Sequence, residues 1–207
     1  TSWPGYEQIP GLVMQGYTAL VREALADLPK PPTHVFLQAG VGGFAASVAG
    51  HMAVLLGAAR PHVTVVEPAR AACLYASASA ARIVKVRDAE PTVMAMLECY
   101  EPSLIAYRVL SRMADGFMTV EEEDALSVMR RLAAPAAGDP AVVAGESGAV
   151  GLAGAIAVLR DPPLAERIGL GPEARLLVIN TEGATDPALY ERIVGQTPSA
   201  VARRPAN

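Results

Sequence analysis

The chain has 207 residues, of which 52% are hydrophobic and 18% are charged, and its formal net charge is −4. This is enough apolar sequence for one sizeable core and too little charge for a disordered chain. The acidic balance, without any run of Lys and Arg, excludes the basic surface that nucleic-acid binding requires. Because no apolar stretch reaches about 20 residues, the sequence also predicts no membrane span.

Cysteine and histidine usage argues against a metal site and against a disulfide framework. Cys73 and Cys99 lack the spacing of a CxxC motif, and His34, His51 and His62 are scattered singly. Two isolated cysteines fit a reduced compartment, so we expect a cytoplasmic protein.

Helices and strands alternate along the first third of the chain. Residues 7–28 place apolar side chains at helical spacing and are followed by prolines, which predicts a helix. Residues 33–39 and 62–68 are short runs of β-branched and large apolar residues, typical of strands buried in a parallel sheet. A glycine-rich turn and an alanine-rich helix lie between these strands, so the unit is β-α-β.

The rest of the chain continues the alternation. The pattern predicts further helices over residues 71–81, 92–100, 103–114, 120–133, 147–160 and 187–194, and strands over residues 82–86 and 174–183. We therefore expect one three-layer α/β domain with a mainly parallel sheet over residues 1–195, and a frayed tail over residues 196–207.

The turn after the first predicted strand contains three glycines, Gly40, Gly42 and Gly43. Glycine allows a positive φ and lets a ligand approach the backbone without a Cβ in the way. The first N–H groups of a helix and the positive end of its dipole bind anions. Three glycines between a strand and a helix therefore predict a phosphate-binding loop.

The identity of the phosphate compound stays open at this point. Residues 40–45, "GVGGFA", fit the pattern G-x-G-x-x-A, and Glu67 ends the next strand where dinucleotide folds place a ribose-binding acid. A nicotinamide- or flavin-dependent oxidoreductase is thus one candidate. Glu67, which precedes Pro68, is equally typical of an acid that caps a helix. A full helix also precedes the glycine turn, whereas a dinucleotide-binding unit usually opens its domain.

Several phrases occur together in the sequence, among them "SWPGY", "QAGVGG", "VVEP", "GESGAVGL" and "INTEGATDP". In this order and at these spacings, the chain resembles the C-terminal half of the diaminopropionate ammonia-lyase family. These are pyridoxal-phosphate enzymes of the type that includes the tryptophan synthase β-subunit and the threonine and serine dehydratases. The resemblance covers residues 1–194 and implies most of the large domain of a type II pyridoxal-phosphate enzyme. It also implies an amino-acid substrate, 2,3-diaminopropionate, which the family splits into pyruvate and ammonia by α,β-elimination.

The resemblance assigns cofactor contacts by position. Three places in the chain are involved, namely Gly40, Val41, Gly42, Gly43 and Phe44 at the phosphate, Glu146 and Ser147 beside the pyridine ring, and Asn180 or Thr181 at the ring nitrogen. The family has Ser at the position of Asn180, and an Asn there keeps a hydrogen-bond donor. No metal is implied.

Two functional groups of the family have no counterpart in this chain. The resemblance places the Schiff-base lysine and a proton-transfer acid upstream of Thr1, and the only lysines present are Lys30 and Lys85. Lys30 lies in a proline-rich loop, and no glycine or helix start accompanies Lys85, so we expect neither to hold the cofactor. The chain would then supply cofactor contacts without catalysing the reaction alone, and a non-catalytic cofactor-binding domain is a further candidate.

Two expectations concern the substrate and the assembly. The family's Gly-Asp-Met phrase is replaced by residues 88–91, "DAEP", which leaves the exact substrate open. The mean hydropathy of +0.29, together with the sheet edges that a half-length chain exposes, predicts a homodimer in the complete protein.

Overall fold

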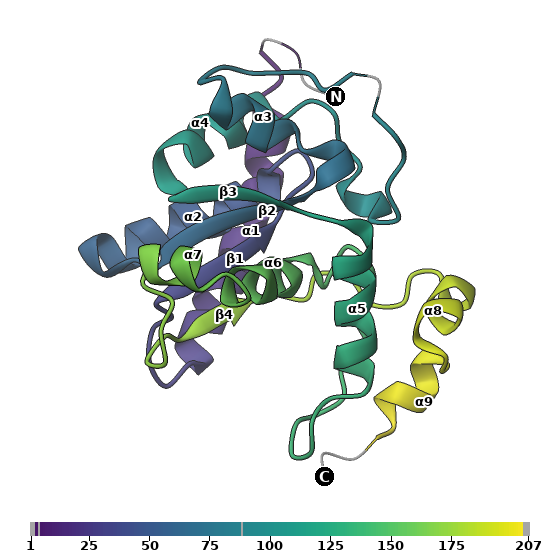
Figure 1. The fold of residues 1–207 in the computed structure, drawn as a ribbon. Helices are drawn as coiled ribbons and strands as arrows, with labels where there is room; N and C mark the ends of the chain where they lie inside the picture. Colours follow the sequence, from purple (N-terminus) through teal and green to yellow (C-terminus); the bar gives the residue numbers. More distant parts are fainter. Residues whose placement is uncertain (1–2, 4, 88, 205–207) are drawn as a thin grey trace.

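The computed structural model describes residue 3, residues 5–87 and residues 89–204. Its helices and strands (Figure 1) follow one another as α1 (Gln8–Asp27), β1 (His34–Gln38), α2 (Gly43–Leu56), β2 (His62–Pro68), α3 (Cys73–Ser79), α4 (Leu104–Met113), β3 (Gly116–Val120), α5 (Glu122–Ala133), α6 (Val150–Leu159), α7 (Pro162–Arg167), β4 (Leu176–Val178), α8 (Pro187–Val194) and α9 (Pro198–Ala202). Residue 88 of the altered phrase and the last three residues of the expected tail lie outside the described residues.

The described residues form a four-stranded parallel sheet with the strand order β3-β2-β1-β4. In its register, Val35 of β1 lies opposite Val63 of β2 and Leu177 of β4. Helices α1 to α4 cover one face, and α6 covers the other with α5 and α7 beside it (Figure 1). The three-layer α/β arrangement with a mainly parallel sheet is therefore confirmed.

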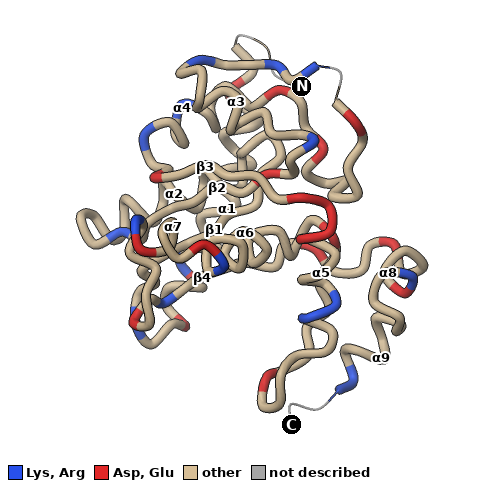
Figure 2. The backbone as a smooth tube through the Cα atoms, viewed as in Figure 1, with Lys and Arg blue, Asp and Glu red and all other residues tan. Residues whose placement is uncertain are grey.

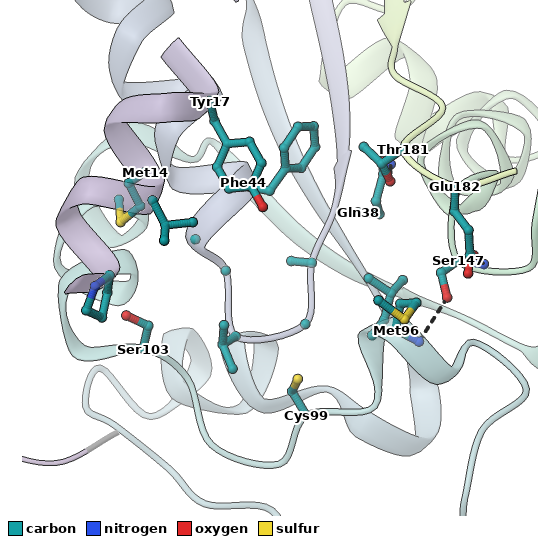
Figure 3. Close-up of a pocket in the computed structure, with 18 of the residues that line it drawn as sticks. Met14, Tyr17, Gln38, Phe44, Met96, Cys99, Ser103, Ser147, Thr181 and Glu182 are labelled. Atoms are coloured by element: carbon teal, nitrogen blue, oxygen red, sulfur yellow. Dashed lines mark hydrogen bonds between the residues drawn. The ribbon is translucent and has the colours of Figure 1, made fainter. Parts of the chain in front are cut away.

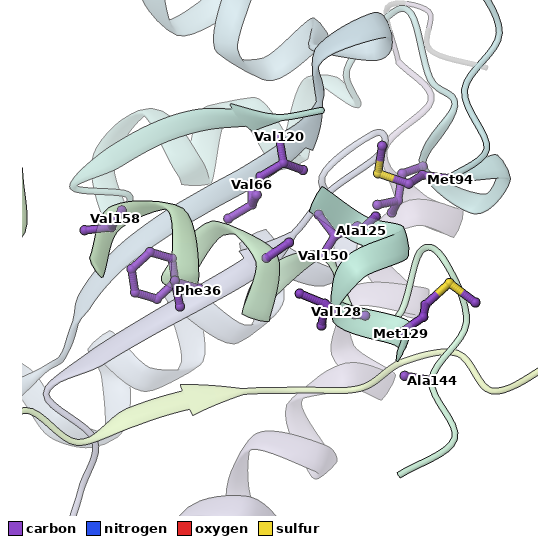
Figure 4. Packing of buried hydrophobic residues seen from close by; sticks show 14 of the residues in the cluster. Phe36, Val66, Met94, Val120, Ala125, Val128, Met129, Ala144, Val150 and Val158 are labelled. Atoms are coloured by element: carbon purple, nitrogen blue, oxygen red, sulfur yellow. The ribbon is translucent and has the colours of Figure 1, made fainter. Parts of the chain in front are cut away.

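Alternate side chains of the strands point into two different hydrophobic cores. Phe36 and Val66 pack with Val150 and its neighbours beneath α5 and α6 (Figure 4). Val35 and Leu37 instead pack beneath the helices of the opposite face. This two-sided burial explains why β1 is a continuous apolar run in the sequence rather than an alternating one.

The path of the chain across the sheet changes direction at β1. From β1 the chain moves outward to β2 and β3, and it then returns to pair β4 with the other edge of β1. Open α/β sheets bind their ligands at such a switch point, outside the carboxyl ends of the strands. Residues 39–42 follow β1 and residues 179–186 follow β4, so these two segments meet at that edge.

Two expected elements do not form. Residues 82–86 are irregular rather than a strand, because the Val84 amide donates to Ser77 Oγ at 2.9 Å and the edge of β2 is already paired with β3. Residues 92–100 contain only a short 3-10 turn, Ala95–Leu97, instead of a helix. The Met96 amide donates to Ser147 Oγ at 3.2 Å, so it does not donate to the carbonyl four residues before it as it would in a helix.

Other elements differ in extent. The sequence reading missed β3, whose residues are mostly half-buried and so lack a clear strand pattern. β4 covers only part of residues 174–183, and Leu176 is 39% exposed, so β4 is an edge strand among the described residues rather than a buried one. The expected frayed tail contains α9, whose Val201 is buried.

Charged side chains are dispersed over the fold. Lys and Arg lie on many elements rather than gathering on one (Figure 2). Among the described residues, no helix combines the length and the apolar character needed to cross a membrane. These residues also hold no group of three or more His, Cys, Asp or Glu side chains that could bind a metal ion. The functional site is best sought at the sheet edge where β1 and β4 end, because the path of the chain changes direction there.

Candidate functional site

A cavity of about 860 Å³ lies at the carboxyl ends of β1 and β4 (Figure 3). Its walls come from α1, from the glycine turn after β1, from the segment before α4, and from the segments that precede α6 and follow β4. Its volume is within the range of small-molecule sites. The cavity thus coincides with the switch point of the sheet.

The glycine turn forms one wall of this cavity, because residues 40–44 all line it. Gly42 has a φ of +94° and is the N-cap of α2, and none of the described side chains caps this helix. A Cβ at Gly42 would lie 2.9 Å from Leu74 Cδ1, and one at Gly40 would lie 2.9 Å from Cys99 Sγ. The backbone conformation at Gly42 therefore favours glycine, and a side chain at Gly40 would require Cys99 to shift. The first amides of α2 are available to an anion in the cavity.

Polar side chains gather at the side of the cavity formed by the end of β4 (Figure 3). Gln38 Nε2 donates to Thr181 Oγ1 at 2.8 Å. The Glu182 carboxylate accepts from the Ser147 amide at 2.9 Å and from the Thr185 hydroxyl at 3.1 Å. These bonds tie the segment before α6 to the segment after β4, so that both present polar groups to one ligand.

An apolar wall lies across the glycine turn from this polar side. Tyr17 and Phe44 meet edge to face with ring centroids 5.5 Å apart (Figure 3). Met96 lies beside Ser147, on the polar side of the glycine turn. Its side chain is 71% exposed, and its backbone amide donates to Ser147 Oγ at 3.2 Å. Apolar walls with a few directed polar groups are typical of a site for an aromatic ligand.

Glu67 does not reach the cavity. Its carboxyl group is fully buried and accepts from the backbone amides of Leu74 at 2.8 Å and Tyr75 at 2.6 Å, in the first turn of α3. Burial raises the pKa of Glu67 to about 8, although these hydrogen bonds act in the opposite direction. The acid caps a helix and cannot contact a ribose, so the oxidoreductase candidate is not supported.

The structure brings most of the expected site residues together. Those that line the cavity are Gly40, Val41, Gly42, Gly43, Phe44, Ser147, Asn180 and Thr181. Glu146 does not line it and is 8% exposed. Burial raises the pKa of Glu146, and the neighbouring charges of Glu182 and Asp186 add to this effect. A contact between Glu146 and the pyridine ring stays a prediction.

The two lysines lie away from the cavity lining that the described residues form. Lys85 Nζ is 3.3 Å from a carboxylate oxygen of Glu101, and its side chain is 60% exposed. Lys30 is exposed in the loop before β1. Neither ammonium group is placed to react with a ligand at the glycine turn.

The sequence reading missed several lining residues, above all Gln38, Met96 and Glu182. Their signal was weak because each acts through contacts with distant segments. Gln38 and Glu182 do share one feature, since each is a polar residue at the carboxyl end of a strand or in the segment directly after it. That position, rather than any motif, could have identified them.

The family model described as "Pyridoxal-phosphate dependent enzyme" matches residues 5–182, and the chain belongs to this family. The similar proteins share the name of one enzyme. The diaminopropionate ammonia-lyase of Escherichia coli is 39% identical over 208 residues, which cover 98% of this chain and 52% of that enzyme. The enzyme of the same name from Salmonella typhimurium is 39% identical over 216 residues, with 97% and 52% covered.

Solved structures agree with this grouping. The crystal structure of the Escherichia coli diaminopropionate ammonia-lyase in complex with an aminoacrylate-PLP azomethine reaction intermediate matches with a TM-score of 0.86 and 38% sequence identity. The match covers 94% of this chain and 51% of that chain. The chain therefore spans about half the length of the curated relatives it matches.

Proposed function

We propose that the full-length protein is a pyridoxal-phosphate-dependent ammonia-lyase that converts 2,3-diaminopropionate into pyruvate and ammonia. In this proposal, residues 1–207 supply the phosphate cradle and the contacts to the cofactor ring. The Schiff-base lysine and the proton-transfer acid lie in the part of the protein outside this chain. The observation that carries the proposal is the uncapped N-terminus of α2, which opens into a cavity of about 860 Å³.

The residues of the cavity fit pyridoxal phosphate. The glycine turn offers backbone amides to a phosphate, and the Thr181 hydroxyl offers a hydrogen bond to the ring nitrogen. Tyr17, Phe44 and Met96 supply apolar surface for the ring. When bound, pyridoxal phosphate supplies an electron sink that stabilises negative charge at the α-carbon of an amino acid. The part of this chain is to hold the phosphate, orient the ring and shield one side of it from water.

The choice of substrate rests on the similar proteins. The curated relatives reported above carry the name diaminopropionate ammonia-lyase, and about 39% of the residues are identical over nearly all of this chain. Because neither lysine lines the cavity, the chain alone lacks the amine that would hold the cofactor and serve as the base for the α-proton. One positioned acid–base group contributes a factor of about 10² to 10⁴, so the chain alone should have no appreciable turnover.

The experiment compares the full-length protein with residues 1–207 alone. Both are supplied with pyridoxal phosphate and 2,3-diaminopropionate, and pyruvate and ammonia are measured. The full-length protein should release two molecules of ammonia for each pyruvate, because the substrate has two amino groups and pyruvate has none, while the chain alone should release neither product. Absence of pyruvate from the full-length protein would reject the proposed reaction. Turnover by the chain alone at a comparable rate would reject the division of roles.

We further propose that the full-length protein is a cytoplasmic homodimer. Ile9, Leu12 and Val13 of α1 are each more than half exposed and form an apolar surface that a further chain segment or subunit would cover. Both cysteines are free in the structure, which fits a reducing compartment. Light scattering on the full-length protein should give twice the monomer mass, and a monomer at micromolar concentration would contradict the dimer.

A further inference from the structure

Gln38, the last residue of β1, connects the two strand ends that form the cavity. Its side chain is 2% exposed, and its Nε2 donates to the Ile179 carbonyl at 2.7 Å and to Thr181 Oγ1 at 2.8 Å. A carboxamide nitrogen carries two protons, and these two short bonds use both. The contact joins residues that are 143 positions apart in the chain, so it sets how β1 and the segment after β4 face each other.

The direction of this contact determines what the Thr181 hydroxyl can do. A hydroxyl has one proton to donate, and towards Gln38 the hydroxyl oxygen is the acceptor. Among the described residues, the Thr181 hydroxyl makes no other hydrogen bond, and Thr181 lines the cavity. Its proton is therefore left for a ligand atom that accepts a hydrogen bond.

The neighbouring Asn180 is engaged differently. Its Nδ2 donates to the Val143 carbonyl at 3.0 Å, and its Oδ1 accepts from the Glu182 amide at 3.4 Å. A Cβ on Gly148 would lie only 2.3 Å from Asn180 Oδ1, so the carboxamide is packed closely against the backbone there. These contacts use one of the two Nδ2 protons and turn the carboxamide towards Val143 and Glu182, whereas the Thr181 hydroxyl is held by Gln38.

The orientation of the Gln38 carboxamide is fixed. Rotating it by half a turn would place Oε1 against the Ile179 carbonyl oxygen, which has no proton to donate. In the observed orientation Oε1 is buried without a hydrogen-bond partner, and a Cβ on Gly151 would lie 3.0 Å from it. A buried acceptor without a partner is unfavourable. The unpaired Oε1 accompanies an Nε2 that binds both the Ile179 carbonyl and Thr181 at the cavity.

We propose that Gln38 is a positioning residue, which holds the Thr181 hydroxyl so that its proton points at the unprotonated pyridine nitrogen of the cofactor. This inference rests on the proposed function. A donor without a charge leaves the ring nitrogen largely neutral, so Gln38 acts on the cofactor through Thr181 without touching it.

The test uses the full-length protein and two ligands that cannot react with a lysine. One is pyridoxine 5′-phosphate, and the other is its analogue with C–H in place of the ring nitrogen. Gln38→Met should weaken binding of the first ligand roughly threefold to tenfold, the range of one neutral hydrogen bond, and should leave binding of the second unchanged. In a Thr181→Val background, Gln38→Met should cause no further loss. Thr181→Ser should retain the wild-type affinity.

Controls separate this role from a general structural one. Gln15→Met makes the same chemical change at an exposed position of α1 and should alter neither affinity. If Gln38→Met does not fold, Gln38→Asn keeps a carboxamide but withdraws it by one methylene, and the same results are expected. Equal losses for both ligands, or additive losses in the double variant, would overturn the positioning role. Failure of the wild-type protein to bind pyridoxine 5′-phosphate would instead reject the proposed function, and this inference with it.

Discussion

Replacing Glu67 by Gln should lower the stability of the protein at about pH 5. Both oxygens of Glu67 accept backbone amides, from Leu74 and from Tyr75, and the group is fully buried. A Gln side chain has one oxygen, so one of these amides would face an NH₂ group and lose its acceptor. A buried donor left without a partner costs about 1–3 kcal/mol.

The same substitution should also remove a pH dependence. Burial raises the pKa of Glu67 to about 8 from its ordinary value of 4.5. Because the folded state keeps this proton to a higher pH than the unfolded state, the stabilising contribution is complete below pH 4.5 and is lost as the pH rises through about 8. At about 1.4 kcal/mol per pH unit, the loss is on the order of 3–5 kcal/mol.

Urea unfolding of the full-length protein at about pH 5 and about pH 8 measures both effects. The stability advantage of the wild type over Glu67→Gln should be largest at the lower pH and should shrink by at least about 2 kcal/mol at the higher one. Glu23→Gln, an exposed change on α1, provides the control and should show no such trend. A difference between wild type and Glu67→Gln that stays constant with pH would refute the raised pKa, and equal stabilities at about pH 5 would refute the capping role.

Three further variants test separate parts of the structure. Gly42→Ala should destabilise the protein by about 1–3 kcal/mol more than Gly195→Ala in urea unfolding, because both residues have a positive φ but only at Gly42 would the new Cβ meet described atoms within 4 Å. Equal costs would contradict the packing argument. Lys85→Ala should leave pyruvate formation by the full-length protein unchanged, since its ammonium group pairs with an acid outside the cavity lining, and a large loss of rate would return Lys85 to the site. Ser147→Ala should cost about 1 kcal/mol and should speed hydrogen exchange at the Met96 amide, which loses its acceptor. Unchanged exchange would show that Ser147 does not hold this segment.

The elements that the sequence predicted well are those with strong local signals. β1 and β2 are dense apolar runs, and α8 begins where Asp186 precedes Pro187, with the Asp186 carboxylate accepting from two backbone amides of the first turn. By contrast, residues 92–100 have apolar residues compatible with a helix. In the structure the Met96 amide donates instead to Ser147 Oγ at 3.2 Å, from a residue 51 positions away. No local pattern reports such a contact.

In the candidate site, too, the sequence predicted the residues with local signals and missed those that depend on distant contacts. The glycine turn could be predicted, because positive φ and close approach leave a local mark at Gly42. Gln38 leaves a weaker mark in the sequence, as one polar residue at the end of a buried strand. Its bond to Thr181 could not be predicted, since Thr181 becomes a neighbour only when β4 pairs with β1. Glu67 was open to two interpretations, and only its burial decided in favour of the helix cap.

A crystal structure of the full-length protein with pyridoxal phosphate would locate both ends of the cofactor. We expect the phosphate at the backbone amides of residues 42–44 and the ring nitrogen within hydrogen-bond distance of Thr181 Oγ1, with Gln38 still bonded to that oxygen. A phosphate held elsewhere, or a ring nitrogen held by a group other than the Thr181 hydroxyl, would contradict this expectation.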